Sequence, residues 1–586
     1  MAMLSERRRA AAVMIAATTA AAVVAASATA AVAATAAAPV PPPPAPDFVI
    51  VGGGTAGCAL AARLCAGLPR ANVVLLERGA PRNETEELIV RAPLRTAAAW
   101  RTPTLTAAFP SAPNAGLRGR AVTLLTGTTL GGSSAINGAQ WSEPAAGGGG
   151  AGTWGVAGLT AANAAAYYAR AARTVGAVVP PRRRRPAYTD AWLDAAAAAG
   201  LPRVDGSPGV APPPDRGSWV HPLAVTPDGR RADACAAYVA PALAGACAAN
   251  LRVHQGVSVT KLLYPTARCG GGRRCRRPTA VAGIEYMPSP GAGAPTKAGD
   301  ARVLYARRGV LVAAGPYGSA PLLHRSGIGP AAALRSAGIP PLVDLPVGEG
   351  ISARASGTVI GRYSGVPLAW VNNATAAALP AVLAQWRAGR GGLLATAPTS
   401  GLSRWTAGAG GYTSVSFSAL TTPPGAPHFF ATCIPNPRSV GRLRVAAANT
   451  SLAAPPVVET NLLGDPRDVA TLGACMRQQQ AVVAAFRPGF GMVAVAPTRG
   501  GTPFTDDAVQ AAALSGLHIV GGAAVGPVLD ARLRVKGFRN LWVVDASAVP
   551  TMPRSAGPMS SVYALAEFAA EAIVRQYGGV CGGGRG

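Results

Sequence analysis

The sequence predicts an α/β fold built on a mainly parallel β-sheet. Residues 47–51 (DFVIV) form a short apolar, β-branched run that is typical of a fully buried parallel strand. A Gly-rich turn at 52–57 (GGGTAG) follows, then a helical stretch at 58–68 and a second strand at 72–76 (NVVLL). Because parallel strands need a crossover connection, which is usually a helix, this order indicates a βαβ unit.

The glycines of this turn have the spacing of a dinucleotide-binding loop. Gly52 permits the tight turn, Gly54 lets a pyrophosphate approach the backbone, and Gly57 lets the helix pack closely on the strand. The spacing alone is a weak signal in a chain with 72 glycines, but the strand, helix and second strand follow it in register. We therefore expect a Rossmann-like domain.

The helix start and the end of the second strand indicate which dinucleotide binds. Thr55 and Ala56 open the helix, whose N-terminus offers N–H groups and a partial positive charge to phosphates. Glu77 lies 20 residues beyond Gly57, where a carboxylate accepts hydrogen bonds from a ribose diol and disfavours a ribose phosphate. The expected ligand is FAD or NAD, not NADP.

A second Gly-rich loop, at residues 127–138 (GTTLGGSSAING), favours FAD. Its N–H and hydroxyl groups, at residues such as Gly127, Gly132 and Ser133, can face a pyrophosphate or the edge of a flavin. Asn137 offers both a donor and an acceptor to an isoalloxazine ring. The segment closely resembles the first signature of the glucose-methanol-choline (GMC) oxidoreductases, and this resemblance implies that the cofactor is FAD.

Two further segments resemble the same family. Residues 315–329 (GPYGSAPLLHRSGIG) are similar to its second signature, with Ala320 where Pro or Ser is usual. Residues 250–262 resemble the strand pair whose backbone meets the adenine, which implies a contact at Val259.

Residues 533–547 resemble the closing strand and FAD-binding turn of the family, which implies cofactor contacts at Asp545 and Ala546. Asp545 also ends the apolar run 541–544, and a buried carboxylate there needs a cofactor hydroxyl or a backbone donor as its partner. Since the similarity covers roughly residues 47–575, the chain is identified as a member of the GMC family.

The resemblance implies a second domain, an antiparallel sheet capped by helices that binds the substrate. Trp405, Phe429 and Phe430 would lie there and either line a pocket or pack in the core. We expect a targeting segment and Pro-rich linker at 1–46, an FAD-binding domain at 47–339, a mainly substrate-binding domain at 340–514, and a return to the FAD domain with a Gly-rich tail at 515–586.

The candidate catalytic base is His518. The resemblance implies that an alcohol gives a hydride to the flavin while a histidine near its N5 takes the hydroxyl proton. Residues 517–526 (LHIVGGAAVG) resemble the family's His-Pro-Val-Gly-Thr-Cys-Arg-Met-Gly pattern, with His518 at the first position. A histidine has an ordinary pKa near working pH, which suits a general base. The alternative is a hydrogen-bonded structural imidazole.

The second catalytic position departs from the family. Residues 557–567 (GPMSSVYALAE) resemble its closing helix, which usually begins with His-Pro or Asn-Pro, but Gly557 has no side chain. Arg554 or Ser555 would have to reach the site instead. Losing one hydrogen-bonding group costs about 10²–10⁴ in rate without abolishing the chemistry.

This departure leaves other functions open. Residues 518–530 are more similar to the plant hydroxynitrile-lyase and HOTHEAD-like branch than to the microbial alcohol oxidases. Residues 392–396 (GLLAT) resemble a run in algal fatty-acid photodecarboxylases, but Thr399 stands near the expected Cys and Gly521 at the expected Asn; Cys433 would be a buried strand residue. A flavin-binding protein without catalysis is the third alternative.

Charge and cysteine spacing exclude other classes. The net charge of +28 comes almost wholly from arginine, and the basic clusters at 182–185 and 273–277 contain no aromatics, so we expect no nucleic-acid partner. No CxxC pair or His/Cys cluster has metal spacing, so we expect no metal. Cys269 and Cys275 flank a Gly/Arg loop and could pair. The expected partner is a small-molecule alcohol, and the sequence does not indicate an oligomeric state.

The N-terminal residues indicate targeting. Three arginines at 7–9 precede an uncharged Ala/Val/Thr run to about residue 38, as in a signal peptide. We expect the secretory pathway or the extracellular space, with the chloroplast as the alternative. Alanine is only marginally apolar, so no stable membrane span is expected.

Overall fold

The computed structural model divides the chain into Met1–Pro44 and one compact unit, Ala45–Gly586. It describes residues 45–578 except 145–148, 186–188, 205–215, 266–276, 290–299, 363–378, 390–392, 396–398, 408–409, 419–427, 447–454, 487–492 and 497–504. Most of the expected targeting segment, both cysteines of the suggested 269–275 pair and the side chains at 399, 405, 429 and 430 lie outside this description. None of the helices within it is long and apolar enough to cross a bilayer.

The βαβ unit predicted from the sequence lies at the centre of a parallel sheet. The first strand is completely buried, as expected for a strand with neighbours on both sides and helices on both faces. All four strand pairings are parallel. The sheet has the order β21 (Leu541–Val543), β12 (Gly309–Val312), β1 (Phe48–Val51), β2 (Val73–Glu77), β8 (Leu251–Gln255).

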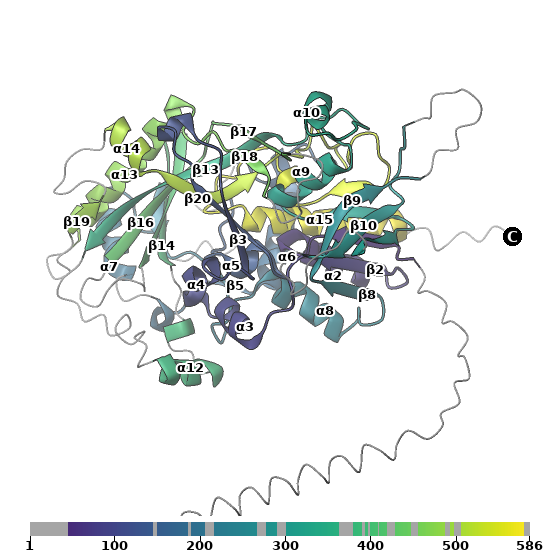
Figure 1. Cartoon of the computed structure of the whole chain (residues 1–586). Coiled ribbons are helices and arrows are strands. Elements are labelled where there is room, and N and C mark those ends of the chain that lie inside the picture. Colours follow the sequence, from purple (N-terminus) through teal and green to yellow (C-terminus); the bar gives the residue numbers. More distant parts are fainter. Residues whose placement is uncertain are drawn as a thin grey trace, which may run out of the picture. The chain divides into compact units, whose positions relative to one another are not determined.

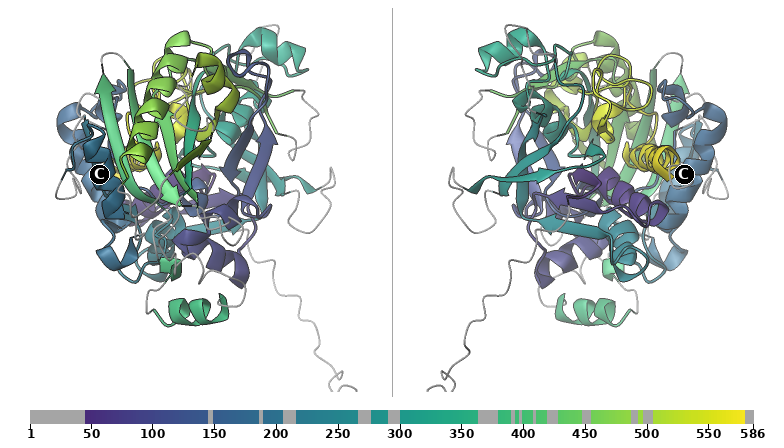
Figure 2. Two further views of the ribbon diagram at one scale, coloured as in Figure 1. Left: turned by 90° about the vertical axis from the view of Figure 1, so that its left-hand side faces the viewer. Right: turned by 90° about the vertical axis from the view of Figure 1, so that its right-hand side faces the viewer.

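The helix after the Gly-rich turn is α2 (Thr55–Gly67), and it packs along α15 (Met559–Gly578). The right-hand view of Figure 2 shows the two side by side, α2 in purple and α15 in yellow. An ion pair joins the two helices. Glu567 on α15 is fully buried and accepts hydrogen bonds from Arg63 on α2 at 2.8–3.1 Å. Such a buried carboxylate requires this partner.

Small elements surround the parallel sheet. A three-stranded antiparallel sheet follows β8, and a two-stranded ribbon crosses toward the second large sheet. Further helices complete this part of the chain. The strands are β9 (Val257–Leu263), β10 (Gly283–Pro288), β11 (Arg302–Tyr305), β3 (Thr106–Pro110) and β4 (Thr123–Gly127); the helices include α4 (Thr96–Trp100), α5 (Ser133–Ile136), α6 (Ala161–Thr174) and α9 (Pro316–Arg325).

The second large sheet is antiparallel and has nine strands within the described residues. The long strand β13 (Glu349–Arg362) pairs with four others, and α13 (Pro466–Ala484) packs across it. Figure 1 shows β13, β14, β16 and β19 in this sheet, with α13 next to them. The remaining strands are β6 (Arg216–Trp219), β14 (Thr399–Ala407), β15 (Gly410–Ser418), β16 (His428–Pro435), β17 (Gly441–Arg444), β18 (Val457–Glu459), β19 (Val493–Ala496) and β20 (Leu514–Val520).

The parallel sheet and the helix-covered antiparallel sheet confirm the predicted fold class. The antiparallel sheet also takes β6 from residues 216–219, which the sequence analysis assigned to the first domain. This strand pairs with β14, so the two parts of the chain are interwoven rather than consecutive.

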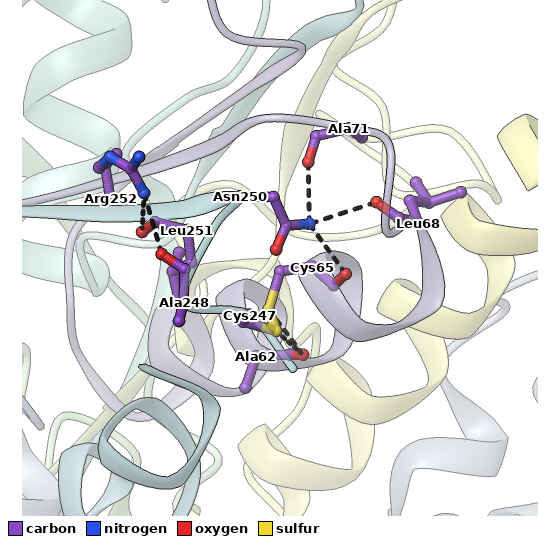
Figure 3. The surroundings of a disulfide bond; sticks show 9 residues. All are labelled: Ala62, Cys65, Leu68, Ala71, Cys247, Ala248, Asn250, Leu251 and Arg252. Atoms are coloured by element: carbon purple, nitrogen blue, oxygen red, sulfur yellow. Dashed lines mark hydrogen bonds between the residues drawn. A yellow bond between two sulfur atoms is a disulfide. The ribbon is translucent and has the colours of Figure 1, made fainter. Parts of the chain in front are cut away.

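Two disulfides, which the sequence analysis did not foresee, stabilise these layers. Cys433, expected as a buried strand residue, is buried in β16 and bonded to Cys475 on α13. Cys65 in the last turn of α2 is bonded to Cys247 ahead of β8. Beside that bond the Asn250 side-chain amide donates to the carbonyls of three residues that end α2 and follow it, Cys65, Leu68 and Ala71 (Figure 3). Carbonyls at the end of a helix lack intrahelical partners, and the amide supplies one, although the carbonyl of Leu68 also accepts from the N–H of Ala71.

Candidate functional site

One cavity of about 1500 Å³ gathers nearly all the residues that the sequence singled out. Its walls come from the βαβ unit, the ribbon β3–β4, one face of α9, the antiparallel sheet and the start of α15. Of the predicted site, only Gly57 does not line it. The predicted residues that do are Gly52, Gly54, Thr55, Ala56, Glu77, Gly127, Gly132, Ser133, Asn137, Val259, His518, Asp545 and Ala546.

The first and last glycines of the turn are required by close packing. Gly52 has φ +100°, and a Cβ there would lie 2.6 Å from the carbonyl oxygen of Ala313. A Cβ on Gly57 would lie 1.9 Å from the carbonyl oxygen of Gly52. Gly57 therefore acts as predicted, by allowing the helix to meet the strand, although it does not face the cavity.

Gly54 and Gly132 form a cradle at the start of α2. A Cβ on Gly54 would meet no protein atom nearer than 3.9 Å, whereas a Cβ on Gly132 would lie 2.6 Å from the Cα of Gly54. Within the described chain no side chain caps α2, and its first turn contains no acid. The free N–H groups of that turn and the bare backbone of both loops fit the pyrophosphate of a dinucleotide.

Glu77 ends β2 and is buried at the cavity wall. It accepts hydrogen bonds from the backbone N–H groups of Gly53 and Gly79, both at 2.8 Å. Burial raises the pKa of this carboxyl, and the two N–H donors oppose that shift. A carboxylate with two donors keeps further lone pairs, which suits the ribose diol expected there.

Asp545 lines the cavity, but its hydrogen bonds go to the protein. It accepts from the N–H of Gly315, the hydroxyl of Ser319, and both the N–H and hydroxyl of Ser547, at 2.5–2.8 Å. Of the two partners that the sequence allowed, the structure therefore shows backbone and serine donors. Asp545 joins the end of β21 to the start of α9 and so shapes the cavity.

Asn137 also holds the loop that carries it. Its Oδ1 accepts from the N–H of Ala139 at 2.8 Å and from Arg231 at 2.9 Å, and its Nδ2 contacts Sδ of Met559 at 3.0 Å. Arg231, which is buried, also donates to Thr96 and to the carbonyl of Ser134. This arginine orders the wall at the end of the signature loop.

His518 lies on β20 and lines the same cavity as the cradle. Neither ring nitrogen has a hydrogen-bond partner in the described part of the chain, and Nδ1 is buried. Burial, followed by the positive charge of Arg354, lowers the pKa of the imidazole to about 3. The ring is therefore neutral near pH 7, and within the described residues it lacks the hydrogen bonds of the structural imidazole weighed above; its role as a base stays a prediction.

Gly557 faces His518 directly. A Cβ placed on Gly557 would lie 3.0 Å from Nε2 and 3.4 Å from Cε1 of the ring. Any side chain at this position would therefore press on the imidazole. Neither Arg554 nor Ser555 is among the cavity residues, and the Ser555 hydroxyl donates to the carbonyl of Gly557 at 2.7 Å. Within the described chain, neither of these two residues replaces the missing side chain.

The structure disfavours the photodecarboxylase alternative at one position. Gly521 has φ +88°, and a Cβ there would lie 2.6 Å from the carbonyl oxygen of Gly350. An asparagine could not occupy this position without moving the backbone.

Sequence reasoning missed four arginines at or behind the cavity, of which Arg78, Arg95 and Arg325 line it. The guanidinium groups of Arg95 and Arg325 have no hydrogen bond or ion pair within the described residues. Arg354 is fully buried behind His518. The detectable signal for Arg354 was a charged residue in the otherwise small and apolar strand 351–360 (ISARASGTVI).

The cradle, the acid at the end of β2 and a neutral histidine in one cavity define a dinucleotide-binding protein with a candidate base beside the cofactor. The GMC oxidoreductase models match residues 46–355, with the N-terminal model, and 437–566, with the C-terminal model. The chain belongs to the GMC oxidoreductase family, whose cofactor is FAD. The placement in the HOTHEAD-like branch stays a prediction.

Individual relatives are distant. A pyranose dehydrogenase of Agaricus campestris is 28% identical over 319 residues, which are 48% of this chain and 52% of that protein. A dehydrogenase of Hericium erinaceus is 26% identical over 396 residues, 59% of this chain and 60% of its own. The chain thus spans between half and three fifths of the length of these curated relatives.

Solved structures share the fold at low identity. A formate oxidase of Aspergillus oryzae has a TM-score of 0.76 at 19% identity, and a pyridoxine 4-oxidase of Mesorbium loti has 0.70 at 22%. Each match covers 91% of this chain and 99% of the other. At these identities the likeness shows the fold.

Proposed function

We propose that this protein oxidises a small-molecule alcohol by hydride transfer from the CH–OH carbon to FAD, with His518 as the general base. The observation that carries the proposal is the neutral imidazole, free of hydrogen bonds within the described chain, in the same cavity as the dinucleotide cradle. A base needs an unprotonated nitrogen within reach of the hydroxyl proton. The names of the relatives, among them a pyranose dehydrogenase and a formate oxidase, support a small substrate.

The residues present can hold FAD at both ends. Gly54, Gly132 and the start of α2 would receive the pyrophosphate, Glu77 the adenosine ribose, and the backbone at Val259 the adenine. When bound, FAD supplies a two-electron acceptor for the hydride.

A residue of the chain itself would then accept the hydroxyl proton of the substrate. His518 takes it from the substrate hydroxyl: the lowered pKa keeps the imidazole unprotonated across the neutral range, although it also makes the ring a weaker base than an ordinary histidine. Gly557 offers no side chain to the substrate oxygen, and His518 is the only histidine among the described residues that line the cavity.

The test is anaerobic mixing of FAD-loaded protein with benzyl alcohol, 1-octanol and D-glucose, followed by the absorbance of oxidised flavin. Hydride transfer bleaches this band, and His518→Ala should slow the bleaching by about 10²–10⁴ while FAD stays bound. Equal rates in His518→Ala would refute the role of His518. If no alcohol bleaches the flavin, the alcohol proposal fails.

Gly557 favours a second candidate, an FAD protein whose reaction does not pass electrons to the flavin, such as a lyase, or one without catalysis. It predicts stable FAD binding with no reduction by any alcohol in the panel. Gly557→Asn would then be expected to leave the protein inactive as well.

A further inference from the structure

Arg354 is a buried cation without an acid. It lies near the middle of β13 with 1% of its surface exposed. Within the described residues no carboxylate pairs with it, and the guanidinium donates instead to the carbonyls of Ser555 at 2.7 Å and Pro553 at 2.6 Å and to Oδ1 of Asn436 at 2.5 Å. Burying an unpaired charge is costly, so a function for it is expected.

The strand that carries His518 bulges directly over Arg354. In the pairing of β13 with β20, Ala353 lies opposite Ile519 and Ala355 opposite Ser515, so residues 516–518 face Arg354 alone. Leu517, in this bulge, has φ +59°, which is rare for a leucine. Bulges of this kind re-aim side chains, and this one sends His518 out of the ladder toward Gly557.

The segment on the other side of the imidazole is held by the same arginine. Arg354 binds the carbonyls of Pro553 and Ser555, the Ser555 hydroxyl binds the carbonyl of Gly557, and the N–H of Ala556 donates to the Ser142 hydroxyl at 2.9 Å. Because Gly557 has no side chain, the peptide backbone itself forms the wall against Nε2. Arg354 fixes that wall.

We infer that Arg354 is a positioning residue for His518, which orders the backbone wall at 553–557 from behind and sets the charge that the imidazole meets. The inference rests on the proposed function for its catalytic meaning, but the arrangement of Arg354 and His518 can be tested without it.

The charge effect has a definite direction. Arg354 from β13 acts on the imidazole by its charge. The other described charged groups on the segments around β20 are Glu349 on β13, Asp545 ahead of the turn that β20 contacts, and Arg554 in the facing segment; β4, which also contacts β20, has none. Asp545 is engaged by its own donors. Removing Arg354 takes away a positive neighbour, which raises the pKa of His518, so the acid limb of a base-dependent rate moves to higher pH.

The experiment compares FAD-loaded Arg354→Met, which removes charge and donors, with Arg354→Lys, which keeps the charge. Arg404→Met is the matched control, because Arg404 is equally buried on the same sheet but donates to the carbonyl of Glu143. Burial, helped by the charge of Arg404, lowers the pKa of Arg354 to about 9, so Arg354 stays charged between pH 4 and 8 with or without Arg404. Imidazole titration is followed by NMR of histidine-labelled protein between pH 4 and 8, with His518 assigned from His518→Gln.

We expect His518 to stay neutral down to pH 4 in the wild type, Arg404→Met and Arg354→Lys. In Arg354→Met its midpoint should rise by about one pH unit or more, so that protonation appears above pH 4. A neutral His518 throughout the range in Arg354→Met would overturn the inference about charge.

The positioning role has its own readout. With benzyl alcohol as the probe, Arg354→Lys and Ser555→Ala should reduce the plateau rate of flavin reduction about tenfold and leave the acid limb in place. Plateau rates equal to the wild type in both variants would overturn the positioning role. Arg354→Lys and Ser555→Ala also keep this role testable if Arg354→Met does not fold. If no alcohol reduces the wild-type flavin, the proposed function fails, while the titration still decides the relation of Arg354 to His518.

Discussion

Gly54 and Gly57 stand three residues apart in the same turn, and the structure predicts opposite consequences for the same substitution. A Cβ at Gly54 would meet no protein atom nearer than 3.9 Å, and Gly54 has φ −82°, which alanine adopts freely. A Cβ at Gly57 would lie 1.9 Å from the carbonyl oxygen of Gly52. Gly54→Ala therefore fills cofactor space, whereas Gly57→Ala forces α2 away from β1.

The expected magnitudes follow from these contacts. Gly54→Ala should leave the free energy of unfolding of the apoprotein unchanged or raise it by about 0.4–1 kcal/mol, because alanine restricts the unfolded chain. The same substitution should weaken FAD binding at least about tenfold, or about 1.4 kcal/mol, since the added methyl group occupies the approach of the pyrophosphate. Gly57→Ala should destabilise the apoprotein by about 1–3 kcal/mol.

Two measurements separate these effects. Urea unfolding of the apoproteins gives the stability, and titration of each with FAD, followed by the quenching of flavin fluorescence, gives the affinity. The reasoning is refuted if Gly54→Ala binds FAD as tightly as the wild type, or if Gly57→Ala unfolds at the same urea concentration as the wild type.

Three further predictions concern stability and compartment. Burial lowers the pKa values of His518 and His221 to about 3 and about 4 in the folded protein, whereas unfolded histidines take up protons near pH 6.5. The free energy of unfolding of the apoprotein should therefore fall as the pH drops from 7 to 5. Urea unfolding at both pH values would show this fall, and a smaller fall in His518→Gln. Cys475→Ser opens the disulfide that closes a 42-residue loop and should cost about 4 kcal/mol in the chain-entropy treatment; a loss below about 1 kcal/mol would contradict this. We propose, since two disulfides suit an oxidising compartment, that a tagged chain enters the secretory pathway; chloroplast import in a fractionation experiment would be the contrary result.

The parts of this site that the sequence predicted are those in which backbone geometry restricts the residue type. Gly52 and Gly57 must be glycine because a Cβ would strike a carbonyl, and that requirement shows in the spacing. Glu77 follows a strand that its composition already marks. His518 was found by its resemblance to a family motif, and the structure places it in the cavity.

The features that the sequence did not predict depend on residues far apart in the chain. The positioning role of Arg354 depends on its hydrogen bonds to Pro553 and Ser555, about 200 residues later in the chain. The bulge at 516–518 exists only in the pairing of β20 with β13. Cys65 and Cys247 are separated by 182 residues. Asp545 was expected at the cavity, but its protein partners, Gly315 and Ser319, are set by tertiary structure.

Strand β13 links two properties that are usually engineered separately. Side chains two residues apart on a strand share a face, so Arg354 lies on the same face as Ser356 and Thr358, both of which line the cavity. The surface that would select a substrate is therefore continuous with the support of the base. The Ser356 hydroxyl also donates to the carbonyl of Ser515, next to the bulge that carries His518. A substitution at position 356 therefore changes the support of the base together with the pocket wall, so selection for new substrates and selection for rate have to be carried out together.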